Sequence, residues 1–115
     1  MPEPLTLLDR YLDLFATEDI HGVLALYAPD AEIVSFGSVS RTHDERHAWL
    51  TRRRGRTSTF SVVTIDQVRT TNRVVLWEAT IEVDEGVAQV AESFVLDDDG
   101  RIAIHLAIAL RYWGR

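Results

Sequence analysis

The second half of the chain, from Ser58 onward, alternates apolar and polar residues with a period of two. Such alternation is typical of strands that bury one face and expose the other. Residues that favour turns interrupt the pattern three times, at 71–72, 84–86 and 97–100. The pattern therefore predicts four antiparallel strands, over about residues 59–69, 73–83, 87–96 and 101–112.

The first part of the chain has helical periodicity instead. Apolar residues recur at helical spacing near its start: Leu5, Leu8, Leu12 and Phe15. They predict a helix over residues 4–16. Asp19 is a suitable N-cap for a short second helix over 20–27, which Pro29 cannot continue. Residues 31–36 then have the composition of a strand.

A third helix is predicted from a capping box. Thr42 is followed three residues later by Glu45, so that the hydroxyl and the carboxylate can each accept a hydrogen bond from the other residue's backbone N–H. This helix should run from about 43 to 54, and Gly55 is its expected stop. Helices followed by a meander of strands predict the α+β class.

Composition limits the possible classes of protein. A chain of 115 residues, 46% of them hydrophobic, is expected to form one domain, 1–115, around a single core. Its longest apolar stretch is too short to span a bilayer and its start lacks a signal peptide, so we expect a soluble, cytoplasmic protein. The net charge of −6 argues against binding nucleic acid. With no cysteine, disulfides and thiolate sites are excluded.

Pairing of the second and third meander strands predicts one apolar face. If Glu85 and Gly86 form the turn, residues whose numbers sum to about 171 face each other. The inward pairs would then be Trp77 with Phe94, Ala79 with Glu92, and Ile81 with Val90. By the alternation rule this face lies against the helices, which makes Glu92 the one acid among apolar residues.

His105 is predicted to share this face with Glu92. Either two-residue turn within 98–100 puts the two side chains opposite or diagonal to each other, whereas a three-residue loop would not. Glu92 could be a neutral acid with a raised pKa, an ionised partner of His105, or part of a structural pair. His105 could transfer protons or could be a satisfied core histidine.

The opposite face of the last strand carries an apolar stripe: Ile102, Ile104, Leu106, Ile108 and Leu110. A solvent-exposed apolar stripe of this kind would be unusual, so we expect a homodimer through Ile104, Leu106 and Ile108. On the inner side, small residues leave room for a helix or a ligand: Ala103, Ala107 and Ala109.

Two further clusters allow alternative interpretations. His43 and His47 share a helix face, but Glu45 lies midway between them rather than at the position of a zinc-protease motif, so no metal or cofactor is expected. The only basic cluster is Arg46, Arg52, Arg53, Arg54 and Arg56. It is either a solvated helix end or a rim that binds the carboxylate or phosphate of a ligand tail.

The run from Arg10 to Leu14 resembles the first helix of ketosteroid isomerases, which belong to the nuclear transport factor 2-like superfamily together with SnoaL-like polyketide cyclases. The resemblance implies a cone-shaped α+β domain, with about three N-terminal helices on a curved, mainly antiparallel sheet. It also implies that Tyr11 donates a hydrogen bond to an oxyanion and that Glu92 replaces a second, protonated donor. Ser35 and Ala107 stand where isomerases and cyclases have catalytic aspartates.

These observations lead to a functional hypothesis. We expect a cofactor-independent acid–base enzyme of the isomerase, cyclase or dehydratase type, acting on an apolar carbonyl-bearing molecule such as a polyketide or steroid-like compound. Tyr11 and Glu92 would stabilise the oxyanion, and His105 would move the proton. The predicted substrate-binding residues are Ser35, Trp49, Trp77 and Phe94. The alternative is a non-catalytic module that binds a small molecule or dimerises, without contact to nucleic acid or membrane.

Overall fold

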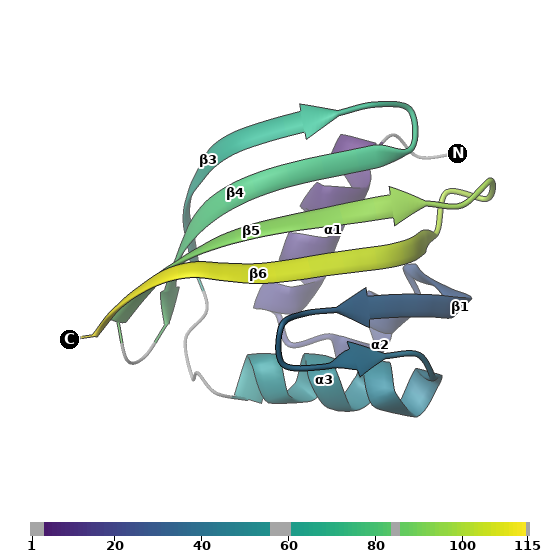
Figure 1. Cartoon of the computed structure of the whole chain (residues 1–115), viewed down its shortest axis with the longest axis horizontal. Coiled ribbons are helices and arrows are strands. Elements are labelled where there is room, and N and C mark those ends of the chain that lie inside the picture. The colour runs from purple at the N-terminus through teal and green to yellow at the C-terminus, as the bar shows by residue number, and fades with distance from the viewer. Residues whose placement is uncertain (1–3, 56–60, 84–85, 115) are drawn as a thin grey trace.

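The computed structural model describes residues 4–55, 61–83 and 86–114. Three helices pack on one curved six-stranded sheet (Figure 1). The helices are α1 (Pro4–Ala16), α2 (Ile20–Leu24) and α3 (His43–Gly55). The strands are β1 (Tyr27–Val34), β2 (Val39–Ser40), β3 (Ser61–Thr70), β4 (Val74–Val83), β5 (Gly86–Leu96) and β6 (Ile102–Gly114). The predicted α+β class is confirmed.

The strand order is β2-β1-β6-β5-β4-β3. Neighbouring strands are antiparallel except β1 and β6, which are parallel. Strand β6, the last strand of the predicted meander, thus lies between β5 and β1 in the interior of the sheet. Helices α1 and α3 lie on the same side of this sheet (Figure 1). None of the described helices is long and apolar enough to cross a membrane.

Helix α1 has the predicted bounds, and Asp19 caps α2 by accepting a hydrogen bond of 2.8 Å from the Gly22 backbone N–H. The predicted end of α2 at residue 27 is wrong. Tyr27 instead begins β1, where it pairs with Ile102 and buries its ring in the core. Tertiary pairing thus overrides the local helical pattern.

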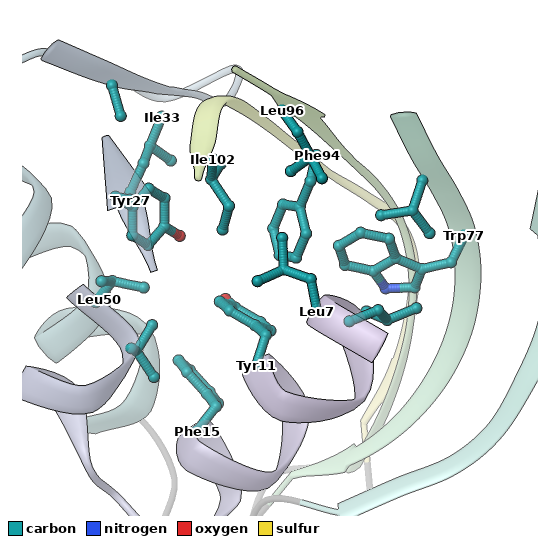
Figure 2. Packing of buried hydrophobic residues seen from close by; sticks show 14 of the residues in the cluster. Leu7, Tyr11, Phe15, Tyr27, Ile33, Leu50, Trp77, Phe94, Leu96 and Ile102 are labelled. Carbon is teal, nitrogen blue, oxygen red and sulfur yellow. The ribbon is translucent and has the colours of Figure 1, made fainter. Parts of the chain in front are cut away.

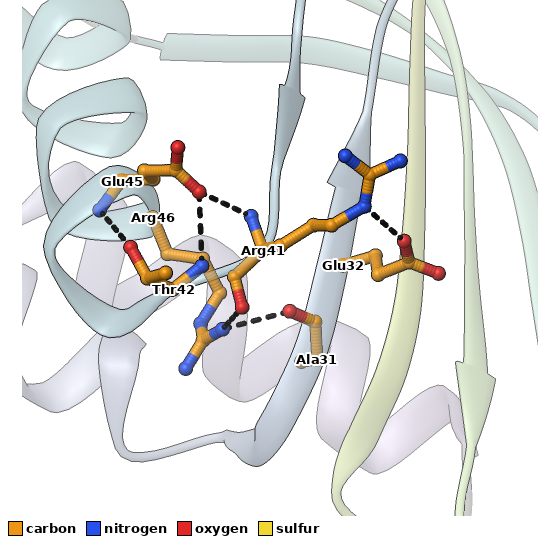
Figure 3. A network of polar contacts seen from close by, with 6 residues as sticks. All are labelled: Ala31, Glu32, Arg41, Thr42, Glu45 and Arg46. Atoms are coloured by element: carbon orange, nitrogen blue, oxygen red, sulfur yellow. Dashed lines mark hydrogen bonds and ion pairs between the residues drawn. The ribbon is translucent and has the colours of Figure 1, made fainter.

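The start of helix α3 confirms the predicted capping box (Figure 3). The Glu45 carboxylate accepts hydrogen bonds from the backbone N–H groups of Arg41 (2.9 Å) and Thr42 (3.1 Å), and the Thr42 hydroxyl accepts one from the Glu45 N–H (3.1 Å). These backbone donors lower the pKa of Glu45. We call Arg41, Thr42 and Glu45 the helix-start cluster.

Arg46 is not part of a solvated helix end, because only 3% of it is exposed. Its guanidinium donates to three backbone carbonyl oxygens, those of Pro29, Ala31 and Arg41. Figure 3 shows two of these contacts. Arg46 therefore connects helix α3 to strand β1, and the solvated interpretation is wrong at this position.

Strands β4 and β5 pair two positions away from the predicted register. Trp77 faces Glu92, Ala79 faces Val90 and Ile81 faces Ala88, because Val83 pairs with Gly86. A shift of two residues changes the partners but leaves every side chain on the same face. The predicted apolar face is therefore confirmed: Trp77, Ala79, Ile81, Val90 and Phe94 are all buried. Figure 2 shows Trp77 and Phe94 packed beside Leu7 and Tyr11 of helix α1.

The last hairpin matches the diagonal alternative. Phe94 faces His105 and Glu92 faces Ala107, although the loop between the strands covers residues 97–101. A register shift between Val95 and Leu96 compensates for the longer loop.

The outer stripe of β6 differs from the prediction at its first residue. Ile102 is fully buried and lies in the core (Figure 2), because the register shift turns it inward. Leu106 and Leu110 are 40% and 47% exposed, Ile108 is also exposed, and Ile104 is half-buried. The homodimer through this face stays a prediction, which the hydrodynamic mass would test.

Asp66 lies on the outer face of the sheet. A register shift in β3 places Val68 opposite Trp77, and the Asp66 carboxylate accepts hydrogen bonds from the hydroxyls of Thr64 and Thr80. Asp66 therefore takes no part in the inner face that faces the helices.

Candidate functional site

A pocket of about 730 Å³ opens between the end of helix α3 and the loop that joins β1 to β2. Val90 of β5 and residues 107–109 and 112 of β6 also line it. Apolar side chains form much of its wall: Trp49, Ile81, Val90, Ala107 and Ala109. The polar residues along it are Ser35, Ser38, Arg52, Arg53 and Tyr112. A concave, mainly apolar surface with a few polar groups is the usual form of a small-molecule site.

Two of the four predicted substrate-binding residues line this pocket. Ser35 contributes from the loop after β1, and Trp49 contributes from α3. Trp77 and Phe94 instead pack against each other in the core, with ring centroids 4.7 Å apart, and do not belong to the pocket wall. They do not line this pocket, because helix α1 covers this part of the inner face (Figure 2).

Arg53 connects the pocket with the protein interior. Its guanidinium donates two hydrogen bonds to the Glu92 carboxylate, with N–O distances of 2.8 and 2.5 Å. It also lies over the rings of Trp49 and Phe15, 5.1 and 5.7 Å from their centroids. The side chain of Arg53 is 19% exposed and that of Glu92 only 4%. A bidentate pair of this kind fixes the guanidinium in one orientation.

Glu92 and His105 meet, as their shared face predicts. The Nε2 atom of His105 lies 2.7 Å from Oε1 of Glu92, and its Nδ1 atom lies 2.8 Å from the Tyr27 hydroxyl. Both ring nitrogens are therefore occupied, and none of the imidazole is exposed. We call Arg53, Glu92, His105 and Tyr27 the buried cluster.

Glu92 is ionised rather than neutral. Burial acts to raise its pKa, but the Arg53 charge and the hydrogen bonds from His105 and Arg53 outweigh burial and lower the pKa to about 2. The contacts with Arg53 and His105 therefore favour the ionised state of Glu92 over the neutral acid. A carboxylate with this pKa can accept hydrogen bonds at neutral pH but has no proton to donate.

His105 is neutral, because burial lowers its pKa more than the neighbouring Glu92 raises it. An ionised Glu92 can only accept, so Nε2 must carry the ring proton and Nδ1 must accept from the Tyr27 hydroxyl. Burial also raises the pKa of Tyr27, which therefore keeps its proton. The hydrogen bonds thus run in one direction, from Tyr27 through His105 to Glu92.

Tyr11 packs against this cluster without a hydrogen bond of its own. Its ring makes edge contacts with His105 and Phe94, at centroid distances of 5.7 and 4.9 Å. Its hydroxyl is close enough to Tyr27 for the two groups to affect each other's pKa, but it makes no hydrogen bond of acceptable geometry with a described residue. Burial raises the pKa of Tyr11.

A family model for the SnoaL-like domain matches residues 8–105. The chain belongs to the SnoaL-like family. This family belongs to the nuclear transport factor 2-like superfamily, which the resemblance of the first helix also indicates. A comparison with curated protein sequences found no match.

Solved structures share the fold of this SnoaL-like protein. A protein from Sphaerobacter thermophilus superimposes with a TM-score of 0.79 at 23% identity, over 95% of this chain and 97% of that one. A Shewanella putrefaciens CN-32 protein, provisionally named a SnoaL-like polyketide cyclase, gives 0.79 at 14% identity, over 95% and 80%. An epoxide hydrolase from M. tuberculosis, of the LEH-like type, gives 0.69 at 25% identity, over 91% and 80%.

The two positions at which the resemblance implies catalytic aspartates are occupied by Ser35 and Ala107. Ser35 and Ala107 both line the pocket, so a hydroxyl and a methyl group stand there. The described part of the wall contains no carboxylate and no imidazole. Glu92 and His105 lie behind Arg53 and Ala107, and neither they nor Tyr11 contribute to the described wall. Among the described residues, no group of three or more acidic or histidine side chains could hold a metal ion.

Sequence reasoning missed two members of the buried cluster. The sequence pattern predicts Tyr27 at the end of a helix, and it groups Arg53 with a basic cluster that is either a solvated helix end or a rim for an anionic ligand tail. One signal was available, because a buried carboxylate at Glu92 requires a cationic partner. The sequence alone did not indicate which of the helix-end arginines this partner is. Arg54 and Arg56 lie outside the side chains and residues that the structure describes.

Proposed function

We propose that this protein is a cofactor-independent acid–base enzyme of the isomerase, cyclase or dehydratase type that acts on an apolar, carbonyl-bearing small molecule. The observation that carries the proposal is the position of Arg53, which lines an apolar pocket while Glu92 fixes its guanidinium. Membership of the SnoaL-like family and structural relatives named as a cyclase and an epoxide hydrolase support an enzymatic role.

Arg53 is suited to the step that these reaction types share. When a proton leaves the carbon next to a carbonyl group, negative charge develops on the oxygen. A guanidinium has five N–H donors, and two hydrogen bonds to Glu92 leave others for this oxygen. Because the cation is already oriented, little reorganisation is needed when the charge appears. In this proposal Arg53 takes the role of oxyanion partner that the resemblance to ketosteroid isomerases implies for Tyr11 and Glu92.

Glu92 is the proposed proton acceptor. Its Oε1 atom accepts from both Arg53 and His105, whereas Oε2 has a hydrogen bond only from Arg53 among the described residues. With Arg53 fully paired to it, Glu92 is a weak base. A substrate oxygen that shares the Arg53 guanidinium takes up part of its positive charge, so this charge stabilises the buried carboxylate less and the pKa of Glu92 rises. Substrate binding would thereby strengthen the base, while His105 and Tyr27 position the carboxylate.

A second candidate function is ligand binding without chemistry. The absence of carboxylates and imidazoles from the described pocket wall favours it, because a proton acceptor must be within reach of the substrate. One experiment separates the two functions. Binding of methyl octyl ketone is followed by the NMR signal of the Trp49 indole N–H, and the exchange of the protons beside its carbonyl is measured in D₂O.

The enzyme proposal predicts binding together with exchange that is at least about tenfold faster than in Arg53→Met and Glu92→Gln. Arg10→Met is the matched control, because Arg10 is an exposed arginine outside the described pocket wall. Binding without accelerated exchange would establish the second candidate. Absence of binding by the wild-type protein would refute both.

A further inference from the structure

The pocket has an electrostatic character opposite to that of the whole chain. The protein has a net charge of −6, yet the described pocket wall contains two arginines and no acidic residue. Electrostatic potential inside a concave site depends on the groups that line it, and low-dielectric walls strengthen their field. The pocket therefore favours anions although the protein as a whole repels them.

The two arginines are in different states. Arg53 is already paired with Glu92, so its charge is largely balanced. Arg52 precedes it in helix α3, is exposed at the pocket, and makes no hydrogen bond or ion pair with another described residue. Arg52 is therefore the positive charge that a ligand can use without breaking an ion pair between residues that the structure describes.

The remaining polar groups of the described wall suit the same kind of ligand. Ser35 and Ser38 line the pocket from the loop after β1. The Ser35 hydroxyl donates to the Ser38 carbonyl oxygen (3.3 Å), and the Ser38 hydroxyl can donate to a carboxylate. Trp49, Val90 and Ala107 supply an apolar surface between the polar groups. Such a wall matches a molecule with an apolar body and two separate oxygen functions.

We infer that the natural ligand is an apolar keto acid, whose carbonyl oxygen contacts Arg53 and whose carboxylate contacts Arg52. The inference rests on the proposed function, since it assigns the substrate class of the same pocket. It assigns a specificity role to Arg52, because a neutral ketone would use Arg53 alone. The guanidinium of Arg52 can bind a carboxylate in the bidentate manner that lysine cannot reproduce.

The test uses a matched pair of probes. Methyl octyl ketone is compared with the keto acid in which its far methyl group is replaced by a carboxylate. Both share the ketone and the flexible apolar chain, so the affinity difference reports the carboxylate. Dissociation constants are measured by NMR titration of the Trp49 indole N–H, for the wild type, for Arg52→Gln and for Arg10→Gln as the charge-matched control.

The wild-type protein and Arg10→Gln should bind the keto acid at least about tenfold more tightly than the ketone. Arg52→Gln should lose this preference while its affinity for the ketone stays within about twofold. Equal affinities for the two probes in the wild type, or an unchanged preference in Arg52→Gln, would overturn the inference. Those results would leave the proposed function intact, since it requires only that the ketone binds and exchanges its protons.

Discussion

Helix α3 begins in an exposed polar cluster and ends beside a buried one. The helix-start cluster joins Arg41, Thr42 and Glu45 through hydrogen bonds that span three or four positions of sequence (Figure 3). In the buried cluster, Arg53 bonds to a residue 39 positions away, and His105 bonds to residues 13 and 78 positions away. The helix-start cluster is solvent-exposed and formed within one segment, whereas the buried cluster is formed by residues from distant segments.

This difference has energetic consequences. Exposed polar contacts contribute little, because water replaces each partner when it is removed. A buried ion pair costs a great deal to break, because the remaining charge has no solvent to compensate it. We therefore expect substitutions in the buried cluster to affect stability most, and those in the helix-start cluster to affect it least.

Glu92→Gln should have the largest effect. It leaves the guanidinium of Arg53, which is 19% exposed, without its counter-charge, so we expect a loss of about 3 kcal/mol in the free energy of unfolding. Urea unfolding measures the loss. The double variant Arg53→Met with Glu92→Gln is the control, and it should recover part of the stability. A loss below about 1 kcal/mol in the single variant would show that the pair is effectively exposed.

The pH dependence of unfolding should report the same cluster. The folded-state pKa of Glu92 is about 2 against an ordinary 4.5, so its contribution is full above pH 4.5 and is lost as the pH falls toward 2, by about 3 kcal/mol in total. His105 acts in the same direction: its pKa is lowered from 6.5, so below that pH the unfolded state binds a proton that the folded state excludes.

Acid should therefore destabilise the protein in two stages, which urea unfolding between pH 7 and pH 3 would resolve. Glu45 also has a lowered pKa, but it is exposed, and Glu45→Gln should leave most of the acid dependence in place. If Glu45→Gln removed the dependence and the double variant at Arg53 and Glu92 retained it, the ranking of the two clusters would be reversed.

Two buried tyrosines give a smaller and matched comparison. Tyr27→Phe removes the donor to Nδ1 of His105 and leaves a buried acceptor unsatisfied, which should cost about 1–2 kcal/mol. Tyr11→Phe removes a hydroxyl that lacks a hydrogen bond of good geometry within the described chain, and should cost less. Thermal unfolding of both variants checks the order. Equal losses would mean that the bond from Tyr27 contributes nothing specific.

Thr42→Ala should have the smallest effect, a loss of about 1 kcal/mol, because it removes the N-cap acceptor of α3 but leaves an exposed N–H that water can satisfy. Thr51→Ala, at an exposed position within the same helix, is the control and should change stability little. Circular dichroism during urea unfolding measures both variants. A cost for Thr42→Ala above that of Glu92→Gln would contradict the comparison.

The same contrast explains which parts of the structure could be predicted from sequence. The capping box, the bounds of α1 and the inner face of β5 depend on spacing within one segment. The meeting of Glu92 and His105 was predictable because the two turns considered for the last hairpin differ by two residues in register, which keeps side chains on the same face. The register shift between Val95 and Leu96 preserves this arrangement despite the longer loop. The short strand β2 and the parallel pairing of β1 with β6 have no local signal.

The buried cluster could be predicted only in part. Glu92 and His105 follow from strand parity, but Arg53 and Tyr27 enter from a helix end and a strand whose positions depend on the packing of the whole domain. Trp77 and Phe94 lie outside the pocket wall for the same reason, since the alternation of a strand does not say which part of a face a helix will cover.

The central claim is that Arg53 is shared between Glu92 and the oxygen of a ligand. Its most direct test is an NMR titration of the Glu92 side-chain carboxyl carbon, with and without saturating methyl octyl ketone. We predict that Glu92 does not titrate above pH 4 in the free protein, in line with its pKa of about 2, and that its pKa rises by about one unit or more when the ketone is bound. An identical titration in both samples, with the ketone shown to be bound, would contradict the claim.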